Sequence, residues 1–320
     1  MVNIAGYRFV DLPDRDDLQA PMLEKCNHLD LKGSVLLSPN GINFFLSGEE
    51  EQVKSFIDFL ESDTRFAGIP LKTSFSEYQP FRRMLVKRKK EIISLGMDEI
   101  RPADFSGQRI SPGEFRKIIE SDEDILVLDT RNDYEIRIGS FEGAVDLGIS
   151  SFRDFPSALE SLPEEYKEKT VVMYCTGGIR CEKASAYLIN KGYKNVYQLN
   201  GGIIEYARQV KEHNLENKFL GKNFVFDNRR SERISGDIIS NCHQCGDKCD
   251  EHVNCNNEAC HLLFIQCENC AKKYDGCCSI ECSEIYSLPI EKQKELRRGK
   301  KNSNKIFKKG RFKEKPLNKI

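Results

Sequence analysis

The chain has 320 residues, with 49 Lys or Arg against 50 Asp or Glu, so its formal net charge is −1. Hydrophobic residues make up 39% of the chain, which is enough for folded cores and excludes disorder throughout. No apolar run approaches the roughly 18 residues of a membrane span, and the N-terminus lacks the pattern of a signal peptide. We therefore expect a cytoplasmic protein with reduced cysteines and no membrane partner.

The charge is unevenly distributed along the chain. Residues 291–320 hold thirteen Lys or Arg and three Asp or Glu, a charge of +10, whereas the rest of the chain holds 36 and 47, a charge of −11. A basic segment of this kind can bind a polyanion while the acidic remainder keeps the chain soluble. Residues 289–320 are predicted to be a disordered basic tail, either a nucleic-acid-binding or a solubilising segment.

Residues 1–95 are predicted to form a ferredoxin-like α/β domain. The order of its elements is βαββαβ, which is typical of that fold, and 84–86 is the candidate for a further closing strand. Asn40-Gly41 marks a hairpin, and Pro21 predicts a kink or a restart in the first helix. The expected strands are 7–12, 34–38, 42–47 and 71–78, and the expected helices lie within 14–29 and at 49–60.

A cluster of six basic residues lies within the stretch 81–90, on both sides of the candidate strand 84–86. Together with the basic tail, the cluster favours nucleic acid as the partner, with an affinity that falls steeply with salt. The predicted contacts are Arg82, Arg83, Lys87, Arg88, Lys89 and Lys90.

A linker is expected over 96–112, and residues 113–216 are predicted to form a second α/β domain. Its first helix should begin with a capping box, with Ser111 as N-cap, Pro112 at the first helical position and Glu114 at the third. Apolar strands alternate with helical segments after this point, which indicates a buried parallel sheet. The expected strands are 125–129, 171–175 and 195–199.

The stretch from Cys175 to Cys181 has the composition of an anion-binding loop that leads into a helix. Its glycines let successive N–H groups point to one place, the helix N-terminus adds positive potential, and Arg180 adds a permanent cation. A thiol there should have a lowered pKa and act as a nucleophile; the alternative is a buried, inert cysteine. The loop consists of Cys175, Thr176, Gly177, Gly178, Ile179, Arg180 and Cys181, with Cys175 and Arg180 as the predicted catalytic residues.

The length of the loop separates two chemistries. Cysteine-dependent phosphatases have Cys-x5-Arg, which leaves room for a phosphate, whereas Arg180 gives Cys-x4-Arg here. This smaller loop resembles that of rhodanese domains, which hold one extra sulfur as a cysteine persulfide. The resemblance covers about 100 residues and includes three other motifs: Asp129-Thr130-Arg131-Asn132-Asp133-Tyr134-Glu135, Gly139-Ser140-Phe141-Glu142-Gly143-Ala144 and Gly201-Gly202-Ile203-Ile204-Glu205-Tyr206.

Three further residues near this loop have two interpretations each. Cys181 is either a packing residue at the helix start or a second thiol that resolves a persulfide or protects Cys175 as a disulfide. Asp129, at the carboxyl end of a strand, and Arg131 could be catalytic, but a buried salt bridge that supports the loop is favoured.

Ten of the 13 cysteines lie between Cys242 and Cys282, and such density in a reduced protein indicates metal binding. Cys242-x2-Cys245 and Cys267-x2-Cys270 are two CxxC pairs with 21 residues between them. Residues 217–288 are therefore predicted to be a cysteine-rich segment whose folding energy comes from structural zinc.

A second four-cysteine site is expected in the same segment, formed by Cys255, Cys260, Cys277 or Cys278, and Cys282. An iron–sulfur cluster, disulfides and free thiols remain as alternatives to zinc. Alternative ligands are His243, His252 and His261.

The whole chain, over about residues 5–285, resembles the bacterial rhodanese-containing tRNA uridine-34 hydroxylases. The match is carried by Pro80-Phe81-Arg82-Arg83-Met84-Leu85-Val86-Lys87 and by the stretch from Cys175 to Lys183. This resemblance implies that the chain makes 5-hydroxyuridine at the wobble position of tRNA, with molecular oxygen as co-substrate and Cys175 as the active-site residue.

Three functions are weighed on this basis. The residues alone favour a persulfide sulfurtransferase, and the resemblance favours a tRNA-modifying oxidoreductase in which a thiolate or persulfide at Cys175 forms a reactive oxygen adduct. A binding module that keeps the rhodanese fold without its chemistry is disfavoured by the intact loop from Cys175 to Arg180.

Overall fold

The computed structural model describes residues 1–121 and 123–298. The chain divides into two compact units. Among the described residues, the first unit comprises 1–121, 123–131, 152–216 and 225–229, and the second comprises 132–151, 217–224 and 230–298. In the described part of the chain, no helix is long and apolar enough to cross a membrane.

The first unit begins with a five-stranded sheet of order β4-β1-β3-β2-β5. The first four strands pair antiparallel in ferredoxin-like order, which confirms the predicted fold. The predicted closing strand, β5, instead adds a fifth strand parallel to β2. The elements are β1 (Val2–Arg8), α1 (Arg15–His28), β2 (Lys32–Ser38), β3 (Gly41–Gly48), α2 (Glu50–Glu61), β4 (Lys72–Phe75) and β5 (Met84–Arg88).

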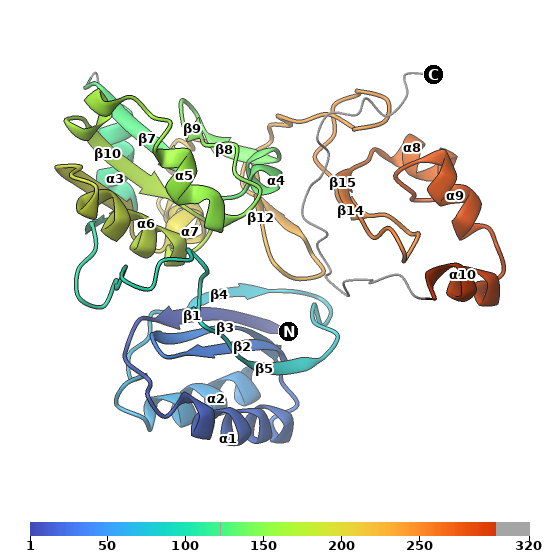
Figure 1. Ribbon diagram of the computed structural model, residues 1–320, viewed down its shortest axis with the longest axis horizontal. Coiled ribbons are helices and arrows are strands. Elements are labelled where there is room, and N and C mark those ends of the chain that lie inside the picture. The colour runs from blue at the N-terminus through green and yellow to red at the C-terminus, as the bar shows by residue number, and fades with distance from the viewer. Residues whose placement is uncertain (122, 299–320) are drawn as a thin grey trace. The chain divides into compact units, whose positions relative to one another are not determined.

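Helices α1 and α2 cover one face of this sheet (Figure 1). Helix α1 is one continuous helix through Pro21, because buried Met22 and Cys26 anchor its second half in the core. The first strand ends at Arg8, earlier than the predicted 7–12, since its seven residues pair with residues 42–48 of β3.

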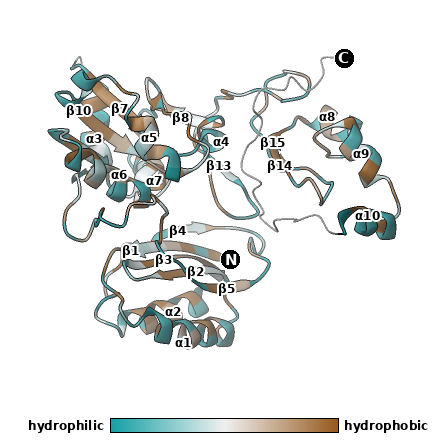
Figure 2. Cartoon of the chain, in the orientation of Figure 1, coloured by the Kyte–Doolittle hydropathy of each residue, from teal (hydrophilic) through white to brown (hydrophobic). Residues whose placement is uncertain are grey.

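A parallel sheet follows in the same unit, with the order β6-β11-β10-β7. Its central strands are buried and apolar, as β7 and β10 show in Figure 2. The capping box is confirmed: Ser111 Oγ accepts from the N–H of Glu114 at 3.2 Å, and Glu114 Oε2 accepts from the N–H of Ser111 at 2.8 Å. The elements are β6 (Gln108–Ile110), α3 (Pro112–Ile119), β7 (Ile125–Asp129), η1 (Phe152–Asp154), α5 (Phe155–Leu159), η2 (Glu164–Lys167), β10 (Thr170–Tyr174), α6 (Ile179–Asn190), β11 (Asn195–Leu199) and α7 (Gly202–Glu212).

The second unit combines a small antiparallel sheet with the cysteine-rich segment. The sheet has the order β13-β12-β8, and Phe141 and Phe219 pack edge-to-face across it with ring centroids 5.2 Å apart. The elements are α4 (Asp133–Ile136), β8 (Gly139–Phe141), β9 (Val145–Asp146), β12 (Phe219–Phe224), β13 (Ser231–Arg233), β14 (His252–Asn254), β15 (Leu263–Ile265), α8 (Glu268–Lys273), α9 (Ile280–Tyr286) and α10 (Ile290–Arg297).

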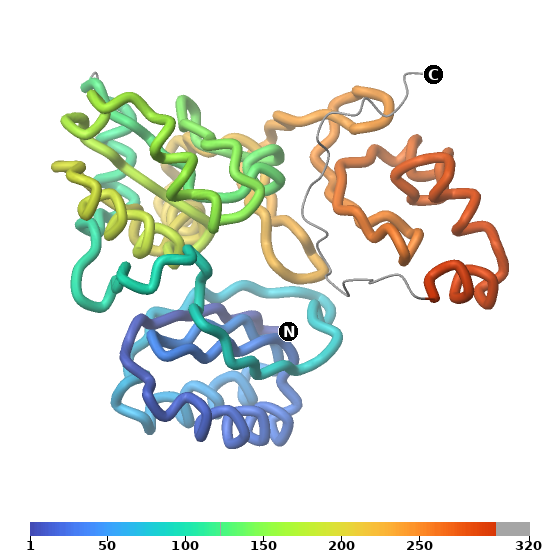
Figure 3. The backbone as a smooth tube through the Cα atoms, in the orientation of Figure 1, coloured from blue at the N-terminus to red at the C-terminus, as the bar shows by residue number. Residues whose placement is uncertain are grey.

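The start of the segment predicted to be a disordered tail is helical. Helix α10 (Ile290–Arg297) is the red helix at the end of the described chain in Figure 3. It is rich in strong helix formers, and Lys294 Nζ pairs with Glu291 Oε1 at 2.8 Å. The remainder of the predicted tail, 299–320, lies outside the described residues.

Candidate active site and cysteine clusters

Cys175 follows the last residue of β10 and begins a tight loop that enters α6. Gly178 is the N-cap of α6 and has φ of +98°, a left-handed conformation that glycine adopts without strain. Its N–H donates to Cys175 Sγ at 3.0 Å, and the backbone N–H groups of Arg180 and Cys181 also donate to this sulfur. The loop therefore forms the predicted anion cradle around Cys175 Sγ.

This environment stabilises the thiolate. Burial on its own raises the pKa of Cys175, but the Cys181 thiol, the Arg180 guanidinium and the backbone donors together lower the pKa to about 5. At neutral pH this lowered pKa favours the anionic form of the sulfur, and its action as a nucleophile stays a prediction. Arg180 is itself held by Thr176, whose Oγ1 lies 3.3 Å from its Nη2, and by the Phe226 ring, 5.9 Å from its Cζ.

The segment that begins with Gly201 and Gly202 packs against the backbone of the Cys175 loop. Ile203 N–H donates to the Cys175 carbonyl at 3.0 Å, and Ile204 N–H donates to the Thr176 carbonyl at 3.2 Å. A Cβ on Gly202, whose φ is +65°, would lie 2.4 Å from the Cys175 carbonyl oxygen. The close contact of the two backbones thus explains the Gly201-Gly202 motif.

Cys181 lies in the same buried loop and contacts Cys175. Its Sγ is 3.6 Å from Thr130 Oγ1, and its side chain is fully buried. Burial and the neighbouring Cys175 thiolate raise the pKa of Cys181 well above its usual value, so Cys181 is a neutral thiol. Its place beside Cys175 is the one that a resolving thiol would need.

Asp129 and Arg131 form a fully buried ion pair at the base of the site. Arg131 Nη2 lies 2.6 Å and its Nε 2.9 Å from the two Asp129 oxygens, and its backbone N–H donates to Oδ1 at 3.0 Å. The Arg131 guanidinium also lies 5.6 Å from the ring of Tyr174, the residue before Cys175. This arrangement favours structural support over catalysis.

Arg131→Ala should destabilise the protein by about 3–5 kcal/mol, because it leaves Asp129 as an unpaired buried charge. The measurement is the denaturant midpoint for unfolding of the full chain. Arg208→Ala is the matched control, since it removes an exposed arginine that pairs with Glu205 and Glu212, and it should leave the midpoint nearly unchanged. Equal midpoints for the two variants would contradict the supporting role of the buried pair.

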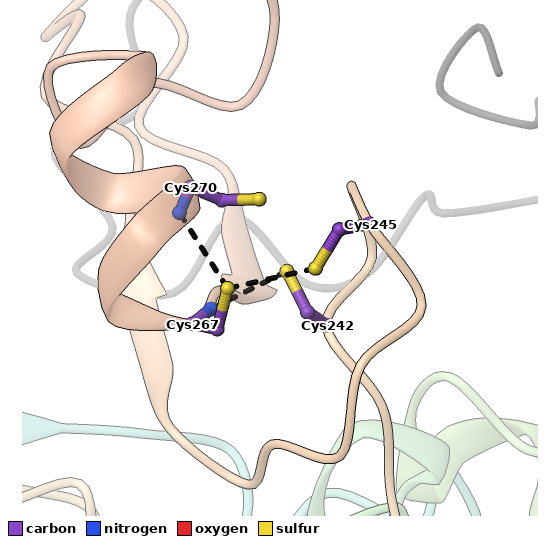
Figure 4. Close-up of side chains that lie close together, drawn as sticks. All are labelled: Cys242, Cys245, Cys267 and Cys270. Carbon is purple, nitrogen blue, oxygen red and sulfur yellow. Dashed lines mark hydrogen bonds between the residues drawn. The ribbon is translucent and has the colours of Figure 1, made fainter. Parts of the chain in front are cut away.

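The first cysteine cluster contains both CxxC pairs (Figure 4). The ligand atoms of Cys242, Cys245, Cys267 and Cys270 lie within 4.8 Å of one another. Cys267 N–H donates to Cys242 Sγ at 3.3 Å, and Cys270 N–H donates to Cys267 Sγ at 3.5 Å. Four thiolates at this separation fit a tetrahedral metal site.

The second cluster contains Cys255, Cys260, Cys278 and Cys282, with sulfurs within the same 4.8 Å. Of the two candidates for its third ligand, the structure brings in Cys278 and not Cys277. The reason is local: Cys278 N–H donates to Cys255 Sγ at 3.4 Å, and Cys278 Sγ lies 3.6 Å from Cys260 Sγ.

The histidines weighed as alternative ligands lie outside both clusters. His243 Nδ1 accepts from Ile265 N–H at 3.3 Å, His252 packs on Phe224, and His261 lies 3.4 Å from Asn254 Nδ2. In the described chain the two clusters are therefore all-cysteine sites, and both can hold a metal ion.

Known families and proteins match the chain along nearly its full length. Residues 1–92 match the UPF0176 acylphosphatase like domain, 111–209 the Rhodanese-like domain and 220–283 the Rhodanase C-terminal family. The chain is 42% identical over 314 residues to the tRNA uridine(34) hydroxylase of Leptospira interrogans, covering 98% of this chain and 85% of the relative. It is 43% identical over 320 residues to that of Pectobacterium carotovorum, covering 96% and 87%. The chain belongs to the tRNA uridine(34) hydroxylase family.

The basic residues predicted to contact nucleic acid lie on and around β5, the edge strand of the N-terminal sheet. All six side chains are exposed, and Arg88 Nη1 lies 3.4 Å from Asp16 Oδ1. Nucleic-acid binding by this strand stays a prediction. The residues are Arg82, Arg83, Lys87, Arg88, Lys89 and Lys90.

Sequence reasoning missed a buried ion pair beside the site. Glu91 directly follows the basic cluster, and its Oε2 accepts a hydrogen bond from Lys183 Nζ of α6 at 2.5 Å. The Glu91 carboxylate also accepts from the N–H groups of Leu95 and Gly96. It further missed Tyr7 and Lys72, which the fold of the first unit brings to the Cys175 loop. Lys183 ends the stretch from Cys175 that carries the family resemblance, but no local motif predicts its pairing with Glu91 or marks Tyr7 and Lys72.

Proposed function

We propose that this chain hydroxylates uridine 34 of tRNA to 5-hydroxyuridine, with molecular oxygen as co-substrate and Cys175 as the reacting residue. The observation that carries the proposal is the Cys175 thiolate, held by three backbone N–H groups and Arg180 in a member of the hydroxylase family. The reaction takes place in the cytoplasm, where tRNA is found and thiols stay reduced.

The electron balance of the reaction favours a role for sulfur. Insertion of one oxygen atom of O₂ into the C5–H bond leaves the other atom to become water, which requires two further electrons and two protons. Oxidation of the Cys175 thiolate and the neighbouring Cys181 thiol to a disulfide releases two electrons and one proton, and the second proton comes from solvent. An external reductant of the thiol class then returns the pair to its reduced form.

The two cysteine clusters would hold structural zinc. Their all-thiolate ligand sets fit zinc, and each is closed by four protein ligands, as in structural sites. When bound, the metal supplies folding energy to a segment with few apolar core residues. The chemistry is assigned to the Cys175 loop.

The experiment is to supply the chain to a bacterial strain that lacks 5-hydroxyuridine and to digest its tRNA for nucleoside mass spectrometry. We expect 5-hydroxyuridine at position 34 only when the chain is present, and growth under ¹⁸O₂ should add two mass units to this nucleoside. Absence of the nucleoside would overturn the proposal, and an unlabelled one would overturn the role of oxygen.

A second candidate, persulfide sulfurtransferase, is favoured by the length of the Cys175 loop, whose cradle is closed around one sulfur atom. Purified protein that converts thiosulfate and cyanide to thiocyanate would support it. The two functions are separated by tRNA analysis, since a sulfurtransferase alone leaves position 34 without a hydroxyl group.

A further inference from the structure

Two side chains of the N-terminal sheet lie against the two glycines of the Cys175 loop. Tyr7 is on β1 and Lys72 is on β4, the strand paired with it. A Cβ on Gly178 would lie 2.9 Å from Tyr7 Oη, and a Cβ on Gly177 would lie 3.3 Å from Lys72 Cδ. The N-terminal domain thus supplies part of the wall of the Cys175 site, opposite the face that carries α1 and α2.

Tyr7 is fixed in place by a buried carboxylate. Its hydroxyl donates to Glu182 Oε1 at 3.2 Å, and the same oxygen accepts from Arg109 Nε at 3.0 Å. The negative charge of Glu182 is therefore already balanced by the ion pair with Arg109 and does not require Lys72.

Lys72 is a half-buried cation without an ion-pair partner in the described chain. Its ammonium lies 4.9 Å from the centroid of the Tyr7 ring, and no Asp or Glu oxygen of residues 1–121 and 123–298 comes within 4.0 Å of it. Burial lowers the pKa of Lys72, which reflects the incomplete solvation of its charge. An anion bound at this point would compensate that loss.

The position of Lys72 also indicates which anion it can meet. Cys175, Thr176 and Gly178 are buried, whereas Gly177 is half-buried and reaches the surface. Lys72 packs its Cδ and Cε against Gly177, at the accessible side of the loop, and the Cys175 thiolate is the strongest of the charges that act on its ammonium. The sulfur already has Arg180 and three N–H groups around it.

We infer that Lys72 binds a backbone phosphate of the RNA whose nucleotide is presented to Cys175. The inference rests on the proposed function, because it takes the substrate to be RNA. The N-terminal domain then does more than dock the tRNA through its basic edge strand: it places one cation directly at the reaction site. Lysine suits this task, since it contacts phosphate as a point charge.

The test compares Lys72→Ala and Lys72→Arg in the full-length protein. Binding of an anticodon stem-loop RNA is measured against salt concentration, together with KM and kcat for hydroxylation. Lys72→Ala should weaken binding and raise KM by about tenfold, with kcat within about twofold, and reduce the salt slope by about one. Lys72→Arg should retain binding within about threefold, because it keeps the charge.

The matched control is Lys54→Ala, which removes an exposed lysine of α2 on the helical side of the same sheet. It should leave affinity and KM within about twofold of the wild type. Unchanged RNA affinity and salt slope in Lys72→Ala would overturn the inference. So would a loss confined to kcat with a raised Cys175 alkylation pKa, which would assign Lys72 to the thiolate instead.

Failure of this inference can be told from failure of the proposed function. RNA binding needs no turnover, so a Lys72-dependent affinity in a wild-type protein that makes no 5-hydroxyuridine would sink the function and leave the phosphate contact standing. Conversely, if the wild-type protein hydroxylates tRNA and Lys72→Ala has the same RNA affinity and KM, the proposed function stands and the phosphate contact is overturned.

Discussion

Cys175→Ala should abolish 5-hydroxyuridine in tRNA, with a loss of at least about a thousandfold, because the variant removes the only atom held in the anion cradle and no neighbour can replace it. Cys181 is the nearest other thiol, and burial, the largest cause of its raised pKa, still keeps it protonated in the variant. The measurement is nucleoside mass spectrometry of tRNA from a strain that depends on the variant for this modification.

Cys26→Ala is the matched control for this prediction. Cys26 is also a fully buried cysteine of the first unit, but it lies in α1, where burial raises its pKa to about 12. Its loss should leave the modification intact at a small cost in stability. Full modification in the Cys175→Ala strain would contradict the assignment of Cys175 as the reacting residue. It would then favour a rhodanese fold that serves only as a binding module.

Loss of metal from the cysteine clusters should unfold most of the segment from 240 to 290. The second cluster packs with a small apolar core around Phe264, and its hairpin strands β14 and β15 have only three residues each. Hairpins of this size do not fold alone in water, so each metal is expected to contribute about 10 kcal/mol or more of folding energy. Elemental analysis should find two metal ions per chain, and a strong chelator should make this segment sensitive to protease.

Two adjacent cysteines give this prediction an internal control. Cys278→Ala removes a member of the second cluster and should lose one of the two metal ions, whereas Cys277→Ala removes a buried cysteine outside it and should retain both. The opposite result, with metal lost from Cys277→Ala alone, would show that the cluster is assigned to the wrong sulfur.

The parts of the fold that were predictable are those set by local pattern. Continuous apolar strands, the capping box at Ser111 and the glycines around Cys175 are each encoded within a few residues, and the structure has them in the expected places. The first strand was misplaced because β1 contains Ala5 and Gly6, which weaken its apolar alternation.

The parts that could not be predicted depend on pairing between distant segments. Lys72 reaches the Cys175 loop only because β4 pairs with β1, and neither strand carries a motif for this contact. Cys277 and Cys278 are neighbours with identical side chains, so only the fold of their backbone decides which sulfur joins the cluster. For the same reason the pairing of β8 with β12, which joins 139–141 to 219–221, has no signature in the sequence.

The most direct test of the central claim, that the loop makes Cys175 a thiolate at neutral pH, is the pH dependence of its alkylation. The rate of modification by iodoacetamide is followed by mass spectrometry of the peptide that contains Cys175. Because only the thiolate reacts, the rate should rise with pH, reach half its maximum near the pKa of about 5 and stay level through neutral pH. Arg180→Met should move that midpoint upward, since it removes a cation from the cradle. A wild-type midpoint near the pKa of an ordinary cysteine, about 8.5, would contradict the account.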